Sequence, residues 1–298
     1  MENYSSYDAM GLSELVAKGE VSPTELLNDA LARAEDANDK LNCFSALFPE
    51  IGKKQIADGL PESPLSGVPF ATKDLAVAIE GAPLTNGSRL FKGNIASEDS
   101  TIVARYRKAG LVLFGQTTSP EYGLTTSTES ALYGQTRNPW NLERTSGGSS
   151  GGASATVASG VIPLAQASDG GGSIRIPAAC TGLFGMKPSR GRIPMGPDKT
   201  ENWNGLSTVH AVSRSVRDNA ALMDLTAGRE IGARYVAPDA PGSFLAAVSS
   251  PPRPLRIGMW VNAPNGTKPD ADAHKGLYDT VRLLQELGHW VEDADPHI

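Results

Sequence analysis

The sequence predicts an α/β protein, because short apolar runs with strand character alternate along it with segments of helical periodicity. The apolar runs lie at 65–77, 111–114 and 161–165, and helical patterns with start and stop signals fall between and after them. Of the 298 residues, 40% are hydrophobic and 20% are charged, which is ordinary for a globular protein with a sizeable core. By length the chain is one large domain or two small ones.

Residues 1–60 are predicted to be helical. An apolar stripe ends at Gly19, and Ser22-Pro23-Thr24-Glu25 is a capping box with proline in the first helical position. Apolar residues then recur at helical spacing as far as Ala34. We assign packing, and no chemistry, to this segment.

The run Gly67–Val77 is predicted to be a buried strand that contains Lys73. Lysines at strand ends usually keep their amine in water, but this one has apolar neighbours on both sides. Burial lowers the pKa of an amine, and a neutral amine can accept a proton near neutral pH. The neighbouring Asp74 would oppose this by favouring the charged amine. We expect Asp74 to point away, because consecutive residues of a strand face opposite sides.

The next part of the chain is predicted to bring a loop, a helix, a strand and a long connection. The loop spans Gly81–Ser97, Ser100 caps a helix that runs to Lys108, and Leu111–Phe114 is a short buried strand. Residues 115–146 are polar and rich in threonine, serine and glycine. Long irregular segments inside domains are usually functional or disordered, and we favour a functional one.

Two glycine-flanked serine clusters follow, at 147–152 (GGSSGG) and 170–173 (GGGS). A small-residue helix at 153–159 and a strand at 161–165 are predicted between them, and a helix at 174–181 after them. Glycines let another backbone or a ligand approach closely, and such loops can turn several N–H groups toward one anion. A serine hydroxyl beside such a concavity is a candidate nucleophile for a carbonyl carbon. The expected oxyanion donors are the N–H groups of Gly170, Gly171, Gly172 and Ser173.

The stretch 147–187 resembles the signature of the amidase signature family, whose members hydrolyse carboxamides with a Lys–Ser–Ser triad. GGSSGG is followed by DGGGSIRIP at 169–177 and by GLFGMKP at 182–188. The resemblance implies that Ser173 is the nucleophile. It implies that Ser149 is the bridging serine, preceded by a cis peptide bond, and that Lys73 is the base.

The resemblance also implies a fold and a domain organisation. The fold is a mixed central β-sheet covered by helices on both faces, in one domain over 1–298. That domain would comprise a scaffold (1–60), a catalytic core (61–230) and a strand–helix–strand segment (251–298). Family members usually continue well past the position of Ile298, so we expect the chain to lack about the last third of the family's length. It looks closer to free-standing bacterial amidases, including those that open cyclic nylon oligomers, than to amidotransferase subunits.

Further residues receive supporting or pocket roles. By resemblance, Asp169 and Arg175 hold the serine loop in shape, and Ser150 supports the triad; a plain surface ion pair is the alternative for the first two. The candidates for the substrate pocket, which are equally well explained as surface-loop residues, are Tyr122, Thr125 and Tyr133.

Two alternative functions stay open. Gly147–Gly151 also fits the G-x-S-x-G elbow of α/β-hydrolase esterases, with Ser149 as nucleophile. That motif needs a strand before it and a histidine partner, whereas Trp140–Ser146 is polar without a predicted strand and the histidines have no triad context. The second alternative is that the chain is an inactive or partner-dependent fragment, such as an amidotransferase A-type subunit. A nucleotide-binding P-loop is disfavoured, because G-x-x-x-x-G-K-[ST] is absent.

Composition disfavours several kinds of partner. The net charge of −6 and the lack of a Lys/Arg cluster argue against nucleic acid, and no apolar run is long enough to span a membrane. Cys43 and Cys180 have no metal-ligand spacing and are expected to be reduced, buried thiols. We expect a small amide substrate, no cofactor, no metal and a cytoplasmic location, with the N-terminus unlike a signal peptide. The oligomeric state is open, a homo-oligomer included.

Overall fold

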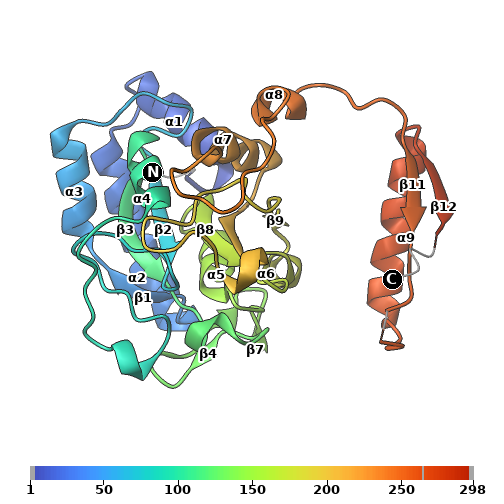
Figure 1. Ribbon diagram of the computed structural model, residues 1–298, viewed down its shortest axis with the longest axis horizontal. Helices are drawn as coiled ribbons and strands as arrows, with labels where there is room; N and C mark the ends of the chain where they lie inside the picture. Colours follow the sequence, from blue (N-terminus) through green and yellow to red (C-terminus); the bar gives the residue numbers. More distant parts are fainter. Residues whose placement is uncertain (1–3, 264, 295–298) are drawn as a thin grey trace. The chain divides into compact units, whose positions relative to one another are not determined.

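The chain divides into two compact units, residues 1–248 and 249–298, each of which is described by itself. The structure, a computed structural model, describes residues 4–263 and 265–294 (Figure 1). The helices of the first unit are η1 (Tyr4–Ser6), α1 (Ala9–Ala17), α2 (Pro23–Leu41), α3 (Pro49–Asp58), η2 (Arg89–Phe91), α4 (Thr101–Lys108), η3 (Glu121–Gly123), α5 (Gly151–Ala158), α6 (Arg175–Thr181), η4 (Trp203–Gly205), α7 (Val216–Thr226) and α8 (Phe244–Val248). Its strands are β1 (Phe44–Leu47), β2 (Pro69–Lys73), β3 (Val112–Thr117), β4 (Glu129–Ser130), β5 (Gly134–Gln135), β6 (Arg137–Asn138), β7 (Asn141–Thr145), β8 (Leu164–Asp169), β9 (Phe184–Gly185) and β10 (Thr208–Ser213).

Two three-stranded sheets form the centre of this unit, in the orders β1-β3-β2 and β8-β10-β9. β2 runs parallel to β3, whereas the β1–β3, β8–β10 and β9–β10 pairs are antiparallel. β2 also lies alongside β8 (Figure 1), and the backbone N–H of Lys73 donates to Gln166 Oε1 across this junction. The mixed α/β architecture expected from the sequence is confirmed.

Helices cover both faces of the sheets, because alternate strand residues enter two different core clusters. Phe70 packs with α1, α4 and α7, and its ring meets Tyr106 edge to face with centroids 4.9 Å apart. Ala71, the next residue of β2, packs instead with α2 and α5. Consecutive strand residues point to opposite faces, so the two clusters lie on opposite sides.

Several local expectations are corrected. The segment 1–60 is not wholly helical, since it contains β1, which pairs with β3. The connection 115–146 is not wholly irregular, since it contains the paired strands β4–β5 and β6–β7. Ser100 precedes α4 as predicted, but its hydroxyl accepts from the N–H of Ala78 rather than capping the helix. Cys180 is exposed, and only Cys43 is buried; both are free thiols.

The second unit consists of β11 (Arg256–Met259), α9 (Ala271–Glu286) and β12 (Trp290–Asp293). The strands are parallel, with Arg256 opposite Trp290. The Asp270 side chain caps α9 by accepting from the N–H of Ala273. This is the strand–helix–strand order predicted for 251–298. In the described part of the whole chain, no helix is long and apolar enough to cross a bilayer.

Candidate active site

Lys73 ends β2, the strand next to β8, and its side chain is completely buried. The amine is surrounded by hydroxyl groups: Nζ lies 2.7 Å from Ser149 Oγ, 3.1 Å from Ser150 Oγ and 3.2 Å from Ser168 Oγ. These serines come from the loop before α5 and from β8. The end of β2 therefore places the Lys73 amine among serines that come from the loop before α5 and from β8.

Burial lowers the pKa of Lys73 from its usual value to about 7, and the negative charge of Asp169 opposes this shift. Removing an ammonium group from water is costly, so the neutral amine is favoured. Near neutral pH a substantial fraction of the amine is therefore unprotonated. A neutral amine still donates two hydrogen bonds and also has a lone pair with which to accept one.

Asp74 does point away from the amine, as expected. Its carboxylate accepts from the N–H of Thr85 at 2.7 Å, from the Thr85 hydroxyl and from the N–H of Asn86 at 3.2 Å. β2 ends at Lys73, so Asp74 lies just outside the strand. Its direction is therefore set by the hydrogen bonds from residues 85 and 86 as well as by strand alternation.

The first serine cluster forms a tight loop between β7 and α5. The peptide bond between Gly148 and Ser149 is cis, as the resemblance implied. A Cβ atom at Gly148 would lie 2.7 Å from the backbone of Ser127, so this position has no room for a side chain. Ser150 braces the loop, since its N–H donates to Ser173 O at 3.2 Å and its hydroxyl donates to Ser168 O at 3.2 Å.

The second serine cluster is shaped by Asp169, the last residue of β8. This buried carboxylate accepts from the N–H groups of Gly172 at 2.7 Å and Ile174 at 3.2 Å, and it forms a two-pronged ion pair with Arg175. These hydrogen bonds lower the pKa of Asp169 although its burial opposes the shift. The pair is more than a surface contact, because the Asp169 side chain is 0% exposed.

The same contacts correct one part of the predicted oxyanion hole. The N–H of Gly172 is directed at Asp169 Oδ1, so it is not free to meet an oxyanion in this conformation. Gly170, Gly171 and Ser173 remain as candidate donors.

Ser149 and Ser173 line one cavity of about 310 Å³. Within the part of the chain that the structure describes, Ser173 Oγ makes no hydrogen bond, so a hydrogen bond between the two hydroxyls has still to form. The other lining residues are Leu75, Ala76, Asn86, Phe91, Tyr122, Gly123, Leu124, Ser168, Gly170, Met195, Lys199, Asn202, Trp203, Ser207 and Val209.

Of the three candidate pocket residues, Tyr122 lines this cavity and the other two do not. Thr125 is exposed, and its hydroxyl donates to Ser127 O at 2.8 Å. The Tyr133 hydroxyl lies 3.1 Å from Thr85 Oγ1, on the segment that holds Asp74. The side chains of Thr125 and Tyr133 thus form contacts within loops and do not line the cavity.

Two residues that contact Lys73 were not predicted from the sequence. Ser168 accepts from the amine, and Gln166 accepts from the backbone N–H at 2.6 Å. The signal was present, because the polar residues 166 and 168 alternate with alanines in β8 and therefore share one face. Their partner on β2 could be identified only once β2 and β8 were known to be neighbours.

The features required of an esterase elbow are missing around Ser149. A strand does precede it, contrary to the prediction, but every residue of β7 is exposed, and β7 forms a two-stranded sheet with β6 rather than joining either three-stranded sheet. His210 is buried, and its Nε2 lies 2.7 Å from Asn219 Oδ1. Burial lowers the pKa of His210 to about 4. In the described part of the chain, His210 makes no hydrogen bond to Ser149 or Ser173.

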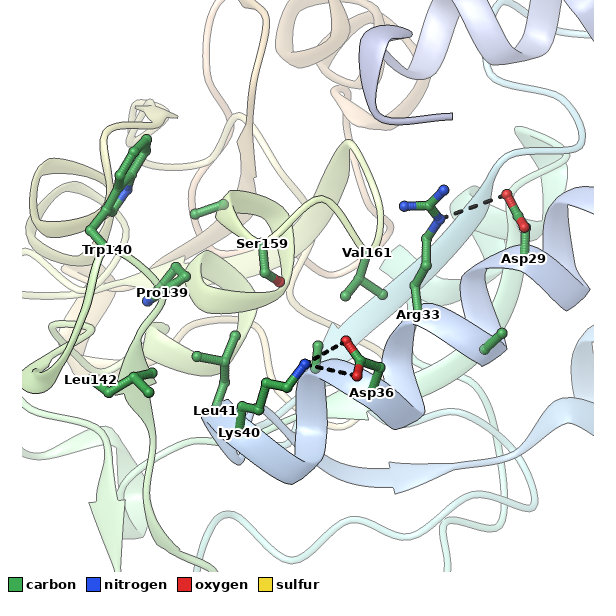
Figure 2. A pocket seen from close by; sticks show the side chains of 13 residues that line it. Asp29, Arg33, Asp36, Lys40, Leu41, Pro139, Trp140, Leu142, Ser159 and Val161 are labelled. Carbon is green, nitrogen blue, oxygen red and sulfur yellow. Dashed lines mark hydrogen bonds and ion pairs between the residues drawn. The ribbon is translucent and has the colours of Figure 1, made fainter. Parts of the chain in front are cut away.

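A larger cavity, of about 680 Å³, lies between α2 and the β6–β7 hairpin (Figure 2). Lys40, Trp140 and Leu142 line it, and it contains none of the predicted triad residues. No group of three or more His, Cys, Asp or Glu side chains in residues 4–263 and 265–294 is arranged to hold a metal ion.

Comparison with known proteins gives consistent matches over almost the whole chain. The amidase family model matches residues 25–297. A 6-aminohexanoate-cyclic-dimer hydrolase from Paenarthrobacter ureafaciens is 40% identical over 97% of this chain and 59% of the relative. An acylamidase from Rhodococcus erythropolis is 35% identical over 99% of this chain and 63% of the relative.

Solved structures give the same result. A 6-aminohexanoate cyclic dimer hydrolase complexed with substrate matches with a TM-score of 0.94 and 38% identity, over 98% of this chain and 61% of that one. A bacterial aryl acylamidase of the amidase signature enzymes matches with a TM-score of 0.88 and 33% identity, over 97% and 61%. The chain thus spans less than two thirds of the length of each of these relatives.

Proposed function

Because this chain belongs to the amidase family, we propose that it hydrolyses carboxamide C–N bonds through an acyl-enzyme on Ser173. The observation that carries the proposal is the buried Lys73 amine, hydrogen-bonded to Ser149 at the wall of the cavity that also contains Ser173. All three residues lie within 61–230, the proposed catalytic core.

The proposed reaction begins with a relay of protons. Neutral Lys73 accepts the proton of Ser149, which in turn accepts the proton of Ser173 as Ser173 Oγ attacks the amide carbon. The proton then returns along the relay to the nitrogen, the C–N bond breaks and the amine leaves. Water hydrolyses the resulting ester, which gives a carboxylic acid and restores the Ser173 hydroxyl. The bridging serine thereby performs the part that histidine plays in other serine hydrolases.

The backbone N–H groups of Gly170, Gly171 and Ser173 are proposed to stabilise the oxyanion. Donors fixed in advance toward the developing charge need no reorganisation during the reaction, and loss of one typically costs about 10² to 10³ in rate. The contacts of Asp169 with Gly172, Ile174 and Arg175 support this role, because they fix the loop that carries the donors.

The proposed substrates are small linear or cyclic amides. This class takes its support from the relatives, which are named as a cyclic-dimer hydrolase of 6-aminohexanoate and as acylamidases. The cavity of about 310 Å³ is at the lower end of the range for small-molecule sites.

An amide-hydrolysis assay tests the proposal. Release of amine from 6-aminohexanoate cyclic dimer and from acetanilide would be followed for the wild-type chain and for Ser173→Ala. We expect turnover of at least one amide by the wild type and none by the variant. Equal rates with the two proteins would overturn the proposal.

A further inference from the structure

Rare backbone conformations are concentrated around the active-site cavity. Among the described residues, six that are not glycine have a positive φ, and four of these line the cavity: Ala76 (58°), Asn86 (52°), Tyr122 (52°) and Trp203 (50°). L-amino acids adopt this region only where the surrounding structure holds them there, and such residues cluster at functional sites. Two of the four, Tyr122 and Trp203, are large aromatic residues. The fold therefore holds both residues at the cavity in a backbone conformation that is unfavourable for them.

Trp203 rests against the loop of the nucleophile. A Cβ atom at Gly170 would lie 2.8 Å from Cε3 of the indole, so the ring packs directly on the backbone at this position. A hydrogen bond holds the turn that carries Trp203, because Arg190 Nε donates to Gly205 O at 2.9 Å. Trp203 is nevertheless 51% exposed. One part of its surface is therefore fixed against Gly170, and the rest is available to a ligand.

Tyr122 is a second aromatic residue that lines the cavity, as Ser149 does. Its backbone N–H donates to Asn86 O at 2.9 Å, and its ring meets Phe91 edge to face with centroids 6.2 Å apart. The next residue, Gly123, approaches the bridging serine so closely that a Cβ atom there would lie 3.1 Å from Ser149 Oγ. Tyr122 is 40% exposed, so this ring is held in place and is also partly open.

The two aromatic residues therefore belong to two segments that approach the serine loops: Trp203 packs on Gly170, and Tyr122 immediately precedes Gly123, whose backbone approaches Ser149. Six more apolar side chains line the same cavity: Leu75, Ala76, Phe91, Leu124, Met195 and Val209. Aromatic rings bind apolar groups well, because they offer large, rigid surfaces that lose contact with water on binding.

We propose that Trp203 and Tyr122 form aromatic walls that select amides carrying an aromatic or extended apolar group, in preference to small amides such as acetamide. This inference rests on the proposed function, since it names the substrate class of the same site. The apolar group is carried either on the acyl side or on the amine side of the scissile bond, and matched ligands distinguish the two.

Binding is measured with the Ser173→Ala protein, which removes turnover. Calorimetry or ligand-observed NMR gives Kd for two pairs of amides that differ by a phenyl group: butanamide with 4-phenylbutanamide, and acetamide with acetanilide. We expect the phenyl-bearing member of at least one pair to bind at least about tenfold more tightly, and Trp203→Ala or Tyr122→Ala to remove most of that difference. The smaller members should change by less than about twofold.

The matched control is Trp140→Ala. Trp140 is 74% exposed and lines the other cavity (Figure 2), so its loss should leave all four Kd values unchanged. Trp203→Phe keeps an aromatic ring and should keep the preference. Thermal unfolding checks that each variant is folded, and if Trp203→Ala is unfolded the decision falls to Tyr122→Ala.

Two outcomes overturn the inference: no preference for either phenyl-bearing amide, or a preference that survives loss of both rings. Labelling of Ser173 in the wild type by a fluorophosphonate distinguishes this failure from failure of the proposed function. If Ser173 is labelled but no preference is found, only the proposal of aromatic walls fails. If the preference is found but Ser173 is not labelled, the proposal that Ser173 is the nucleophile fails.

Discussion

Lys73 is surrounded by three serine hydroxyls and, among residues 4–263 and 265–294, by no carboxylate within hydrogen-bonding distance. A carboxylate in contact would keep the amine charged. The nearest acidic neighbour in the chain, Asp74, is held by Thr85 and Asn86, and Asp169 acts only through its charge at longer range. The site therefore places the Lys73 amine, whose pKa is lowered, next to the Ser149 hydroxyl that it is proposed to deprotonate.

Replacement of this amine is the first prediction. Lys73→Met keeps a long side chain in the buried space but removes the base, and loss of a general base typically lowers the rate by about 10² to 10⁴-fold. We expect kcat/KM for amide hydrolysis to fall by this amount, as measured by amine release. The control is Lys108→Met, at an exposed lysine of α4, which should be fully active. A Lys73→Met protein that is folded and within about twofold of wild type would contradict the assigned role.

The pH dependence of the rate is the second prediction. Burial lowers the pKa of Lys73 to about 7, and only the unprotonated amine can accept a proton. We therefore expect kcat/KM to rise about tenfold per pH unit below pH 7 and to level off above it. A rate profile between pH 5 and 9 checks this. An activity that is constant over this range would show that no group with this pKa acts as the base.

At the scale of elements, the loop between β8 and α6 depends on one buried carboxylate. Asp169→Ala would leave the N–H groups of Gly172 and Ile174 without their partner, whereas Arg175→Ala would leave both bonds intact. We expect kcat/KM to fall by about 10² for Asp169→Ala, because small displacements of catalytic groups have effects of this size. Arg175→Ala should cost less than about tenfold. Comparison of the two variants checks this, and equal losses would show that the ion pair, rather than the backbone contacts, holds the loop.

The attachment of α1 to α7 gives a prediction about stability. The carboxylate of Asp218 is buried and accepts from the N–H groups of Ala9 at 2.8 Å and Met10 at 3.0 Å, at the start of α1. Asp218→Ala would leave both donors unpaired in the interior. Because each such group costs about 1–3 kcal/mol, we expect the free energy of unfolding in urea to fall by about 2 kcal/mol or more.

Asp224 on the same helix is the matched control for this prediction. It accepts from the N–H groups of Phe244 and Leu245 at an exposed position, where water can replace it. Asp224→Ala should therefore cost less than about 1 kcal/mol. Equal effects of the two substitutions would contradict the role given to burial.

The elements that were predicted well are those with a local signal in the sequence. The capping box of α2 is formed, and the glycine-rich clusters were recognisable as loops. β1 was missed within a segment of helical character, because a four-residue strand is defined by its pairing with β3 rather than by its own periodicity.

The site residues that were missed depend on tertiary contacts. Ser168 meets Lys73 only because β2 and β8 are neighbours, and Trp203 meets Gly170 only through the turn at η4. The N–H of Gly172 was expected to face an oxyanion and instead meets Asp169, since a nearby carboxylate competes for any donor in the loop. Sequence spacing carries no information about such competition.

At the scale of the whole molecule, every residue of the proposed triad comes from the first unit. Lys73 lies on one sheet and Asp169 on the other, so the junction of β2 and β8 positions the proposed base relative to the loop of the proposed nucleophile. Helices pack on both faces of these sheets. The relatives named above are longer than this chain, which spans less than two thirds of their length.

The most direct test is the site of covalent modification by a serine-directed fluorophosphonate on the full 298-residue chain. Tryptic peptides analysed by mass spectrometry would locate the adduct. The proposed mechanism predicts modification of Ser173, abolished in Ser173→Ala and much slowed in Lys73→Met. An adduct on Ser149, or one on Ser173 that forms equally fast without the lysine, would contradict it.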